Sequence, residues 1–252
     1  TLARGLERLS LVGCLLGADG AEGLAQVLCA SPQLRHLCVP VDALGPEGLS
    51  HLAMAWPLGL EVLDLRGNGL GLAGAGVLAS KAIWPRLAHL QHLDLKWNGL
   101  GDEGCALVFT ALSGPRPKLR FLNLADNGLG PEGLKPFLQA SQAPALAGLR
   151  GLNLSWNNLG AAGTSLLAVA LPRLSFLEEL HLKAVHLDGA GAVALAPALP
   201  SSLRLLDFFR NSIGAAGARA LIREAPRLGR LEQLNVMGAQ LSEQSLSALR
   251  LA

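Results

Sequence analysis

Three patterns in this sequence could support chemistry, and each suggests a different kind of site. His89 and His92 have the spacing of a pair of metal ligands. Asp64 and Asp94 fall at matching points of two similar segments, as an acid–base or metal-binding pair could. The glycine-rich stretch 69–76 resembles the loops that bind nucleotide phosphates. The elements that hold these residues decide whether any of the patterns is a site.

The histidine pattern needs a helix, because histidines at this spacing converge on one metal ion when they share a helix face. His89 and His92 instead come at the start of a predicted strand. His36 lies two sequence repeats before His92, too far to share a metal ion directly. We therefore expect structural or surface roles for these histidines and no bound metal.

A polar residue occupies the same mid-strand position in successive segments. The row consists of Asp64, Asp94, Asn123, Asn153, Asp207 and Asn235. Stacked strands space equivalent residues evenly, so the row needs no acid–base role, and we expect its side chains to be exposed and solvated. Asp64 and Asp94 are neighbours that repel each other, and Arg66 and Lys96 lie close enough to offset the repulsion.

The glycine-rich stretch 69–76 has counterparts elsewhere in the chain, because a repeat needs small residues where backbones pack closely. No nucleophile–base pair, phosphate-binding loop or metal-ligand cluster stands out in the sequence. The sequence therefore predicts neither an enzyme nor a cofactor-binding protein.

The composition indicates a folded chain without a strong charge. Of the 252 residues, 50% are hydrophobic and 16% charged, with a formal net charge of +2. These values exclude a disordered chain and argue against a nucleic-acid partner. The longest apolar stretch, 189–199, contains Pro197 and is shorter than the roughly 20 residues of a membrane-spanning helix, so we expect no membrane insertion.

The four cysteines, Cys14, Cys29, Cys38 and Cys105, show no paired spacing. Free thiols in a reducing compartment explain this spacing better than a disulfide framework does. We therefore expect a cytoplasmic, intracellular location.

A segment of the form Leu-x-x-Leu-x-Leu-x-x-Asn-x-Leu recurs along the chain. Its first leucines are Leu6, Leu34, Leu60, Leu90, Leu119, Leu149, Leu177, Leu203 and Leu231, at steps of 28, 26, 30, 29, 30, 28, 26 and 28 residues. Nine repeats of this length leave no room for a second domain. We expect one domain over residues 1–252 and, because the chain ends partway through a repeat, a piece of a longer protein.

Each segment predicts a short strand followed by an inward-turning asparagine. In Leu93-Asp94-Leu95 the leucines face inward and the aspartate faces outward. The asparagine satisfies backbone groups that the next bend would bury, so stacked repeats form an asparagine ladder. Its positions are Asn68, Asn98, Asn127, Asn157 and Asn211, with Cys14, Asp42, Val185 and Ala239 as departures. Val185 cannot donate a hydrogen bond, which puts the continuity of the ladder in question there.

A helix is predicted after each strand. The stretches 44–49 and 129–134 read Leu-Gly-Pro-Glu-Gly-Leu, with proline at the first helical position and glutamate in the first turn. Leu134, Phe137 and Leu138 are spaced as one buried stripe. Helices are wider than strands, so the stack should curve with its strands on a concave face and its helices on a convex face.

The repeat length, the Asn-x-Leu-Gly-x-x-Gly pattern and the following helix resemble the ribonuclease-inhibitor subclass of leucine-rich repeats, over essentially the whole chain. The resemblance implies an α/β fold, a curved right-handed solenoid of about nine repeats. The subclass includes ribonuclease inhibitor, the sensing ends of NOD-like receptors and Ran GTPase-activating protein. This chain has few of the many cysteines typical of ribonuclease inhibitor itself.

Large apolar and basic residues fall at concave positions. Trp97 and Trp156 hold equivalent positions two repeats apart, about 10 Å by strand spacing, with Phe121 between them. Tryptophan and arginine are enriched in the hot spots of protein interfaces. The predicted partner-binding patch consists of Trp97, Trp156, Phe121, Arg120, Arg150, Phe209 and Arg210. The alternative is that each tryptophan leans over the rim and covers a loop.

We therefore expect a protein-interaction or scaffolding module that binds a macromolecular partner on its concave face, alone or as a subunit of a larger assembly. The resemblance implies two alternatives. One is the ligand-sensing domain of a NOD-like receptor. The other is a Ran-type GTPase-activating protein, which usually carries an acidic tail, and no acidic run appears here.

Overall fold

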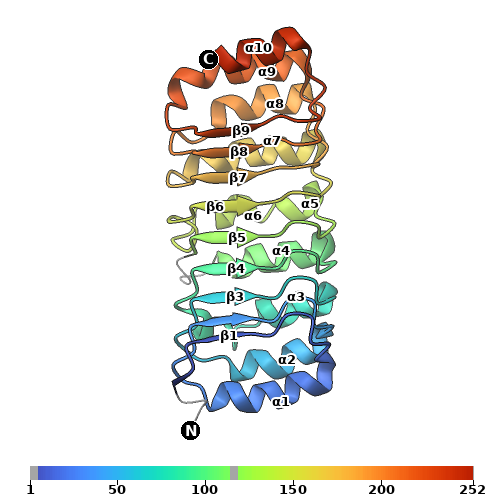
Figure 1. The fold of residues 1–252 in the computed structure, drawn as a ribbon, viewed down its shortest axis with the longest axis vertical. Helices are drawn as coiled ribbons and strands as arrows, with labels where there is room; N and C mark the ends of the chain where they lie inside the picture. The colour runs from blue at the N-terminus through green and yellow to red at the C-terminus, as the bar shows by residue number, and fades with distance from the viewer. Residues whose placement is uncertain (1–4, 114–118, 252) are drawn as a thin grey trace.

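The computed structural model describes residues 5–113 and 119–251, in which nine short strands alternate with helices along one stack (Figure 1). Each strand begins two residues after the first leucine of its repeat. The strands are β1 (Arg8–Ser10), β2 (His36–Cys38), β3 (Val62–Asp64), β4 (His92–Asp94), β5 (Phe121–Asn123), β6 (Gly151–Asn153), β7 (Glu179–His181), β8 (Leu205–Asp207) and β9 (Gln233–Asn235). They form one parallel sheet in sequence order, which confirms the predicted solenoid.

The register of the sheet places leucine beside leucine at the centre of every strand. Leu63, for example, pairs with Leu37 on one side and Leu93 on the other. These side chains point away from the concave face and are almost fully buried in β2 to β8, while Leu9 and Leu234 in the two end strands are partly buried. One hydrophobic core therefore runs the length of the stack between the sheet and the helices.

The helices lie on the opposite side of the core from the sheet. They are α1 (Gly17–Cys29), α2 (Gly45–Ala55), α3 (Gly71–Ala79), α4 (Gly101–Leu112), α5 (Pro131–Leu134), α6 (Phe137–Ala140), α7 (Gly160–Ala170), α8 (Gly189–Leu195), α9 (Gly214–Glu224) and α10 (Glu243–Leu251). Pro46 and Pro131 stand in the first turns of α2 and α5, as predicted.

The fifth repeat differs from the single predicted helix, because α5 and α6 are separated around Pro136. Proline lacks the N–H that a continuous helix would use. Leu134 and Phe137 still face the core and are fully buried, and Leu138 is partly buried. The predicted stripe therefore survives the break in the helix.

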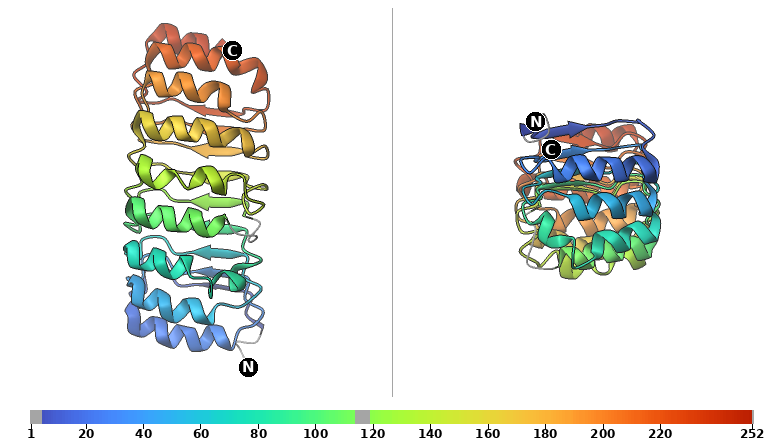
Figure 2. Two further views of the ribbon diagram at one scale, coloured as in Figure 1. Left: turned by 180° about the vertical axis from the view of Figure 1, so that it is seen from behind. Right: turned by 90° about the horizontal axis from the view of Figure 1, so that it is seen from below.

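The stack curves as the widths of its two layers require. Seen along its long axis, the two ends lie toward the strand side and the middle repeats are displaced toward the helix side (Figure 2). The sheet therefore lines the concave face and the helices line the convex face. No helix within residues 5–113 and 119–251 is long and apolar enough to cross a bilayer.

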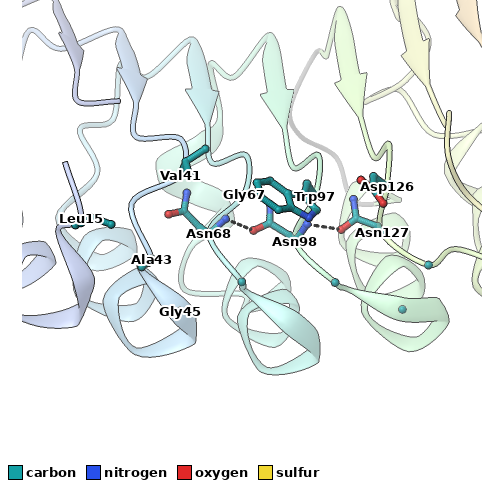
Figure 3. Close-up of a pocket in the computed structure, with 14 residues that line it drawn as sticks. Leu15, Val41, Ala43, Gly45, Gly67, Asn68, Trp97, Asn98, Asp126 and Asn127 are labelled. Carbon is teal, nitrogen blue, oxygen red and sulfur yellow. Dashed lines mark hydrogen bonds between the residues drawn. The ribbon is translucent and has the colours of Figure 1, made fainter. Parts of the chain in front are cut away.

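The asparagine ladder forms where the chain leaves each strand. Asn98 Nδ2 donates to the carbonyl of Leu65 in the preceding repeat at 3.0 Å and to that of Leu95 in its own repeat at 2.9 Å. Its Oδ1 accepts from the backbone of Asn68 at 3.0 Å, and Asn127 does the same for Asn98 at 3.1 Å (Figure 3). Each ladder amide thus joins two repeats and leaves its own polar atoms satisfied.

Four of the six residues of the mid-strand polar row are buried and the other two, Asn153 and Asn235, are partly buried, which corrects the expectation of a solvated row. Asp64, Asp94, Asn123 and Asp207 are each less than 9% exposed. Their Oδ1 atoms accept the backbone N–H two residues later, as in Asp94 to Lys96 at 3.0 Å. This hydrogen bond turns the backbone and so ends each strand. It is the bond that Asp and Asn side chains commonly form in local turns.

Two departures from the ladder have different consequences. Asp42 keeps half of the pattern, because its Oδ1 accepts from the backbone of Cys14 at 2.6 Å, but its buried Oδ2 has no hydrogen-bond partner. Val185 is fully buried and supplies no amide. The ladder resumes at Asn211, whose Oδ1 accepts from the backbone of Val185 at 3.1 Å.

The substitution Asp42→Asn should stabilise the N-terminal repeats by about 1 kcal/mol, the typical net value of a hydrogen bond. By analogy with Asn68, which donates to Val39 at 2.7 Å and Leu65 at 3.0 Å, an amide at position 42 would donate to the carbonyls of Leu11 and Val39. Chemical denaturation of both proteins measures the difference.

The reverse substitution, Asn98→Asp, provides the matched control. It replaces a donor by an acceptor opposite the carbonyls of Leu65 and Leu95, so it should lower stability. Equal effects of the same sign at positions 42 and 98 would contradict this account of the ladder.

Candidate protein-binding surface

The seven predicted patch residues occupy four rows of the concave side. Arg120 and Arg150 immediately precede β5 and β6, and Phe121 is the first residue of β5. Phe209 lies two residues after β8. Trp97, Trp156 and Arg210 each lie three residues after their strands, at the start of the loop that leads to the helix.

Trp97 stands on a strained turn and remains exposed. Its φ is 57°, in the left-handed region that costs an L-residue about 1 kcal/mol, and 59% of the residue is accessible. Its ring lies over Gly67 of the preceding repeat, where an added Cβ would be 2.8 Å from the Trp97 Cε3 atom (Figure 3). The ring therefore covers a neighbouring loop with one edge and offers the rest to solvent.

Trp156, Phe209 and Arg210 come together as one group, called here the Trp156 cluster. The Arg210 guanidinium carbon is 5.8 Å from the Trp156 ring centroid and 5.2 Å from that of Phe209. Trp156 is 44% exposed at a φ of 60°. Ala184 holds the equivalent position in the intervening repeat, and its small side chain leaves room for this contact.

Phe121 belongs to a different contact. Its ring stacks on His92, with centroids 4.4 Å apart and planes 12° apart. On the other side it lies against Gly151, where an added Cβ would be 2.5 Å from the Phe121 Cδ2 atom. Asp126, rather than Phe121, occupies the turn position between Trp97 and Trp156.

Ion pairs connect neighbouring repeats along the row that contains Arg120 and Arg150. Arg150 pairs with Glu178, and Arg204 pairs with Glu232 at 2.7 Å. Arg120 lies between Gln91 and Arg150, and it has no ion-pair partner among the residues that the structure describes. Arg120 is therefore better placed than Arg150 to pair with an acidic group of a partner.

The carboxylates of Asp64 and Asp94 both lie next to the guanidinium group of Arg66. Arg66 forms a two-pronged contact with Asp64, with distances of 2.9 Å from Nε and 2.7 Å from Nη2, and lies 3.6 Å from Asp94. Burial is the main cause that raises the pKa of Asp94. Within the described ranges, no three His, Cys, Asp or Glu residues are placed to hold a metal ion.

All four cysteines are free thiols. Burial raises the pKa of Cys105 to about 12, so this thiol stays protonated within the core. Burial, followed by the charge of Asp64, also raises the pKa of the half-buried Cys38. Neither thiol is activated as a nucleophile.

Sequence reasoning missed the hydrophobic side chains on the N-terminal loops. Leu15 and Val41 are 78% and 45% exposed on the same loop edge as Trp97 (Figure 3). A signal was available, because Gly13, Gly67 and Gly238 hold the turn position where Val41 and Trp97 stand. A large side chain at a position suited to glycine does not help the fold, which indicates a role in binding.

The comparisons with known proteins agree with this architecture. A leucine-rich-repeat family model matches residues 60–79, 86–108, 117–138, 149–168 and 200–221. A solved structure titled as a TLR13–ssRNA13 complex superposes with a TM-score of 0.50 at 19% identity, covering 91% of this chain and 29% of that one. The chain is therefore a leucine-rich-repeat protein.

Similarity to curated proteins defines the subclass. The bovine NACHT, LRR and PYD domains-containing protein 5 is 33% identical over 170 residues, and the pig ribonuclease inhibitor is 31% identical over 173 residues. Each match covers 66% of this chain, which spans only 15% and 36% of the two relatives. The repeats are of the ribonuclease-inhibitor-like form.

The stacking of His92 on Phe121 should make stability depend on pH. Burial, the largest cause, lowers the pKa of His92 from its ordinary value of 6.5, so the unfolded chain takes up this proton first as the pH falls. Stability from neutral His92 is present above pH 6.5 and is lost below it. Unfolding free energies of the native protein and His92→Gln, measured at pH 7.5 and at pH 5.5, should converge at the lower pH. Parallel pH dependence would contradict this role for His92.

Proposed function

We propose that this chain is a protein-interaction module whose partner docks on the concave face. The binding surface would consist of Trp97, Trp156, Phe121, Arg120, Arg150, Phe209 and Arg210. The observation that carries the proposal is the placement of two exposed tryptophans on left-handed turns. Strain of this kind persists in proteins where function requires it.

The chemistry of the surface favours a protein over a small substrate. Tryptophan and arginine are the residue types that dominate binding energy at protein interfaces. The Trp156 cluster would provide a rigid aromatic anchor after the ends of the strands. Arg120, which precedes β5 and has no ion pair among the described residues, would provide a cation near the opposite end of the strands. The bound form would be a non-enzymatic complex, in an intracellular compartment that suits four free thiols.

The second candidate is the ligand-sensing domain of a NOD-like receptor. It is favoured by the similarity to the bovine protein with NACHT, LRR and PYD domains and to the mouse protein NLRC5, which is 34% identical over 142 residues. The two candidates share the concave surface and differ in what lies beyond the chain. A subunit role in a larger assembly uses the same surface, and no observation specifically favours the Ran-type alternative.

The substitution Trp156→Ala should weaken partner binding by about thirtyfold, which corresponds to about 2 kcal/mol. The partner is first identified by crosslinking in extract of the native source and is then titrated as a purified protein. The fold should be kept, because Ala184 already occupies the equivalent turn at a φ of 47°. Trp97→Ala should also weaken binding.

Val169→Ala in the same repeat is the matched control. Val169 is 55% exposed on α7, on the convex side, and its loss should leave affinity unchanged. Undiminished binding by the double variant of Trp97 and Trp156 would refute the concave surface.

A further inference from the structure

A groove lies along the loop edge of the first five repeats, between the ends of the strands and the starts of the helices. Its volume is about 950 Å³. Leu15, Val41, Ala43 and Trp97 line it with apolar atoms, and Asp126 lies at its far end (Figure 3). Backbone of the intervening glycine positions forms the floor. Apart from Trp97 and Asp126, these side chains come from repeats outside the seven-residue concave surface.

The apolar side chains of the groove are not required by the fold. Leu15, Val41 and Trp97 have φ values of 53°, 59° and 57°, where glycine is the unstrained residue. They are 78%, 45% and 59% exposed. The chain thus holds three large apolar groups in water on strained turns, which indicates that another molecule covers them.

The rim of the groove carries charge of one sign. The spans 14–23, 42–49, 68–76, 98–105 and 126–134 run from the turn into the first helical turn of each of the five repeats, and they contain no lysine or arginine. Their exposed acidic residues are Asp19, Glu22, Glu47, Glu103, Asp126 and Glu132. The helix side of the rim therefore favours cations and opposes phosphate groups, while the exposed Lys96 precedes Trp97 on the strand side.

Not every acidic group in these spans is available to a ligand. Asp102 Oδ1 accepts from the backbone of Gly130 at 2.5 Å and of Gly133 at 3.0 Å, so it caps α5 of the next repeat. Glu132 pairs with Lys135 at 2.6 Å. Glu47, Glu103 and Asp126 have no ion pair within the described part of the chain. Asp126 lines the groove, and Glu47 and Glu103 lie in the first turns of α2 and α4.

We propose that this groove binds an extended segment of a partner protein that combines a bulky apolar side chain with lysine or arginine. The apolar side chain would pack between Val41 and Trp97, and the cations would face Asp126 and Glu47 or Glu103. Four repeat steps span about 20 Å, the length of about six extended residues. This site goes beyond the concave surface, with which it shares Trp97.

The test begins with a displayed library of random hexapeptides, panned against the intact 252-residue chain. Enriched peptides should carry at least one large apolar residue and two or more basic residues. The consensus peptide, made with a fluorescent label, is then titrated by anisotropy at low and physiological salt. Its affinity should fall as salt rises. Failure to enrich, or enrichment of acidic or neutral peptides, overturns the proposal.

The double substitution Leu15→Gly with Val41→Gly removes two of the apolar side chains that line the groove without straining the fold, because both residues have positive φ. Affinity for the consensus peptide should fall at least about tenfold, and the thermal midpoint should move by less than about 4 °C. Asp126→Asn should weaken binding in proportion to the loss of one rim charge. Binding that is unchanged in the double variant overturns the proposal.

His186→Gly is the matched control, because His186 holds the same turn position as Leu15 in the seventh repeat, at a φ of 60°, outside the groove. It should leave peptide affinity unchanged. The double variant should also keep the partner that docks on the concave face. Failure of the groove and failure of the concave surface are therefore separate outcomes.

Discussion

The bend that follows each three-residue strand is the constraint on which this molecule depends. At that bend the chain turns from the sheet toward the helix and buries peptide groups that have no partner in their own repeat. The ladder asparagines supply the missing donors and acceptors, as Asn98 does for Leu65, Leu95 and Asn68. The buried aspartates and asparagines at the strand ends start the same turn, because each accepts a hydrogen bond from the backbone N–H two residues later. The parallel register and the continuous leucine core follow once these two sets of bonds set the path of most repeats.

The same bend explains why the candidate surfaces lie where they do. The residue before each ladder position has positive φ in all nine repeats, whether it is glycine, alanine, valine, aspartate, arginine or tryptophan. The fold requires this conformation and does not require any particular side chain there. Recognition groups can therefore be placed at this position without altering the core, and we propose that Trp97, Trp156 and Arg210 are such groups. A related turn position, one residue after the ladder, holds Leu15.

Much of the architecture was predictable because the leucines that define it recur at a nearly constant spacing along the sequence. The first leucines locate every strand to within a residue, and the proline of 129–134 marks the start of α5. The burial of Asp94 was not predicted, because it depends on packing of neighbouring repeats. The break between α5 and α6 was also not predicted, although Pro136 is its local cause. The sequence identified the patch residues by their residue types, but it did not predict which of them contact one another. The contact of Arg210 with Trp156 spans two repeats and needs the small side chain of Ala184 between them, and such a three-residue relation has no signature in a single repeat.

At Val185 the interaction between neighbouring repeats should be weaker than elsewhere in the stack. In a linear array, stability is a sum of terms within repeats and terms between neighbours, so a junction that lacks its ladder hydrogen bonds is a weaker one. The Arg150–Glu178 ion pair and the hydrogen bond from the Lys183 N–H to Ser155 Oγ still cross this junction. At this junction the backbone bonds remain, including Trp156 N to Lys183 O and Gly160 N to Val185 O, while the ladder amide is replaced by a methyl-bearing side chain. Cooperative unfolding should lose its all-or-none character at this point, with the repeats before Val185 and those after it acting as separate foldons. The Trp156 cluster spans this junction, since Trp156 precedes it while Phe209 and Arg210 follow it, so a ligand that grips all three would also lock the two foldons together.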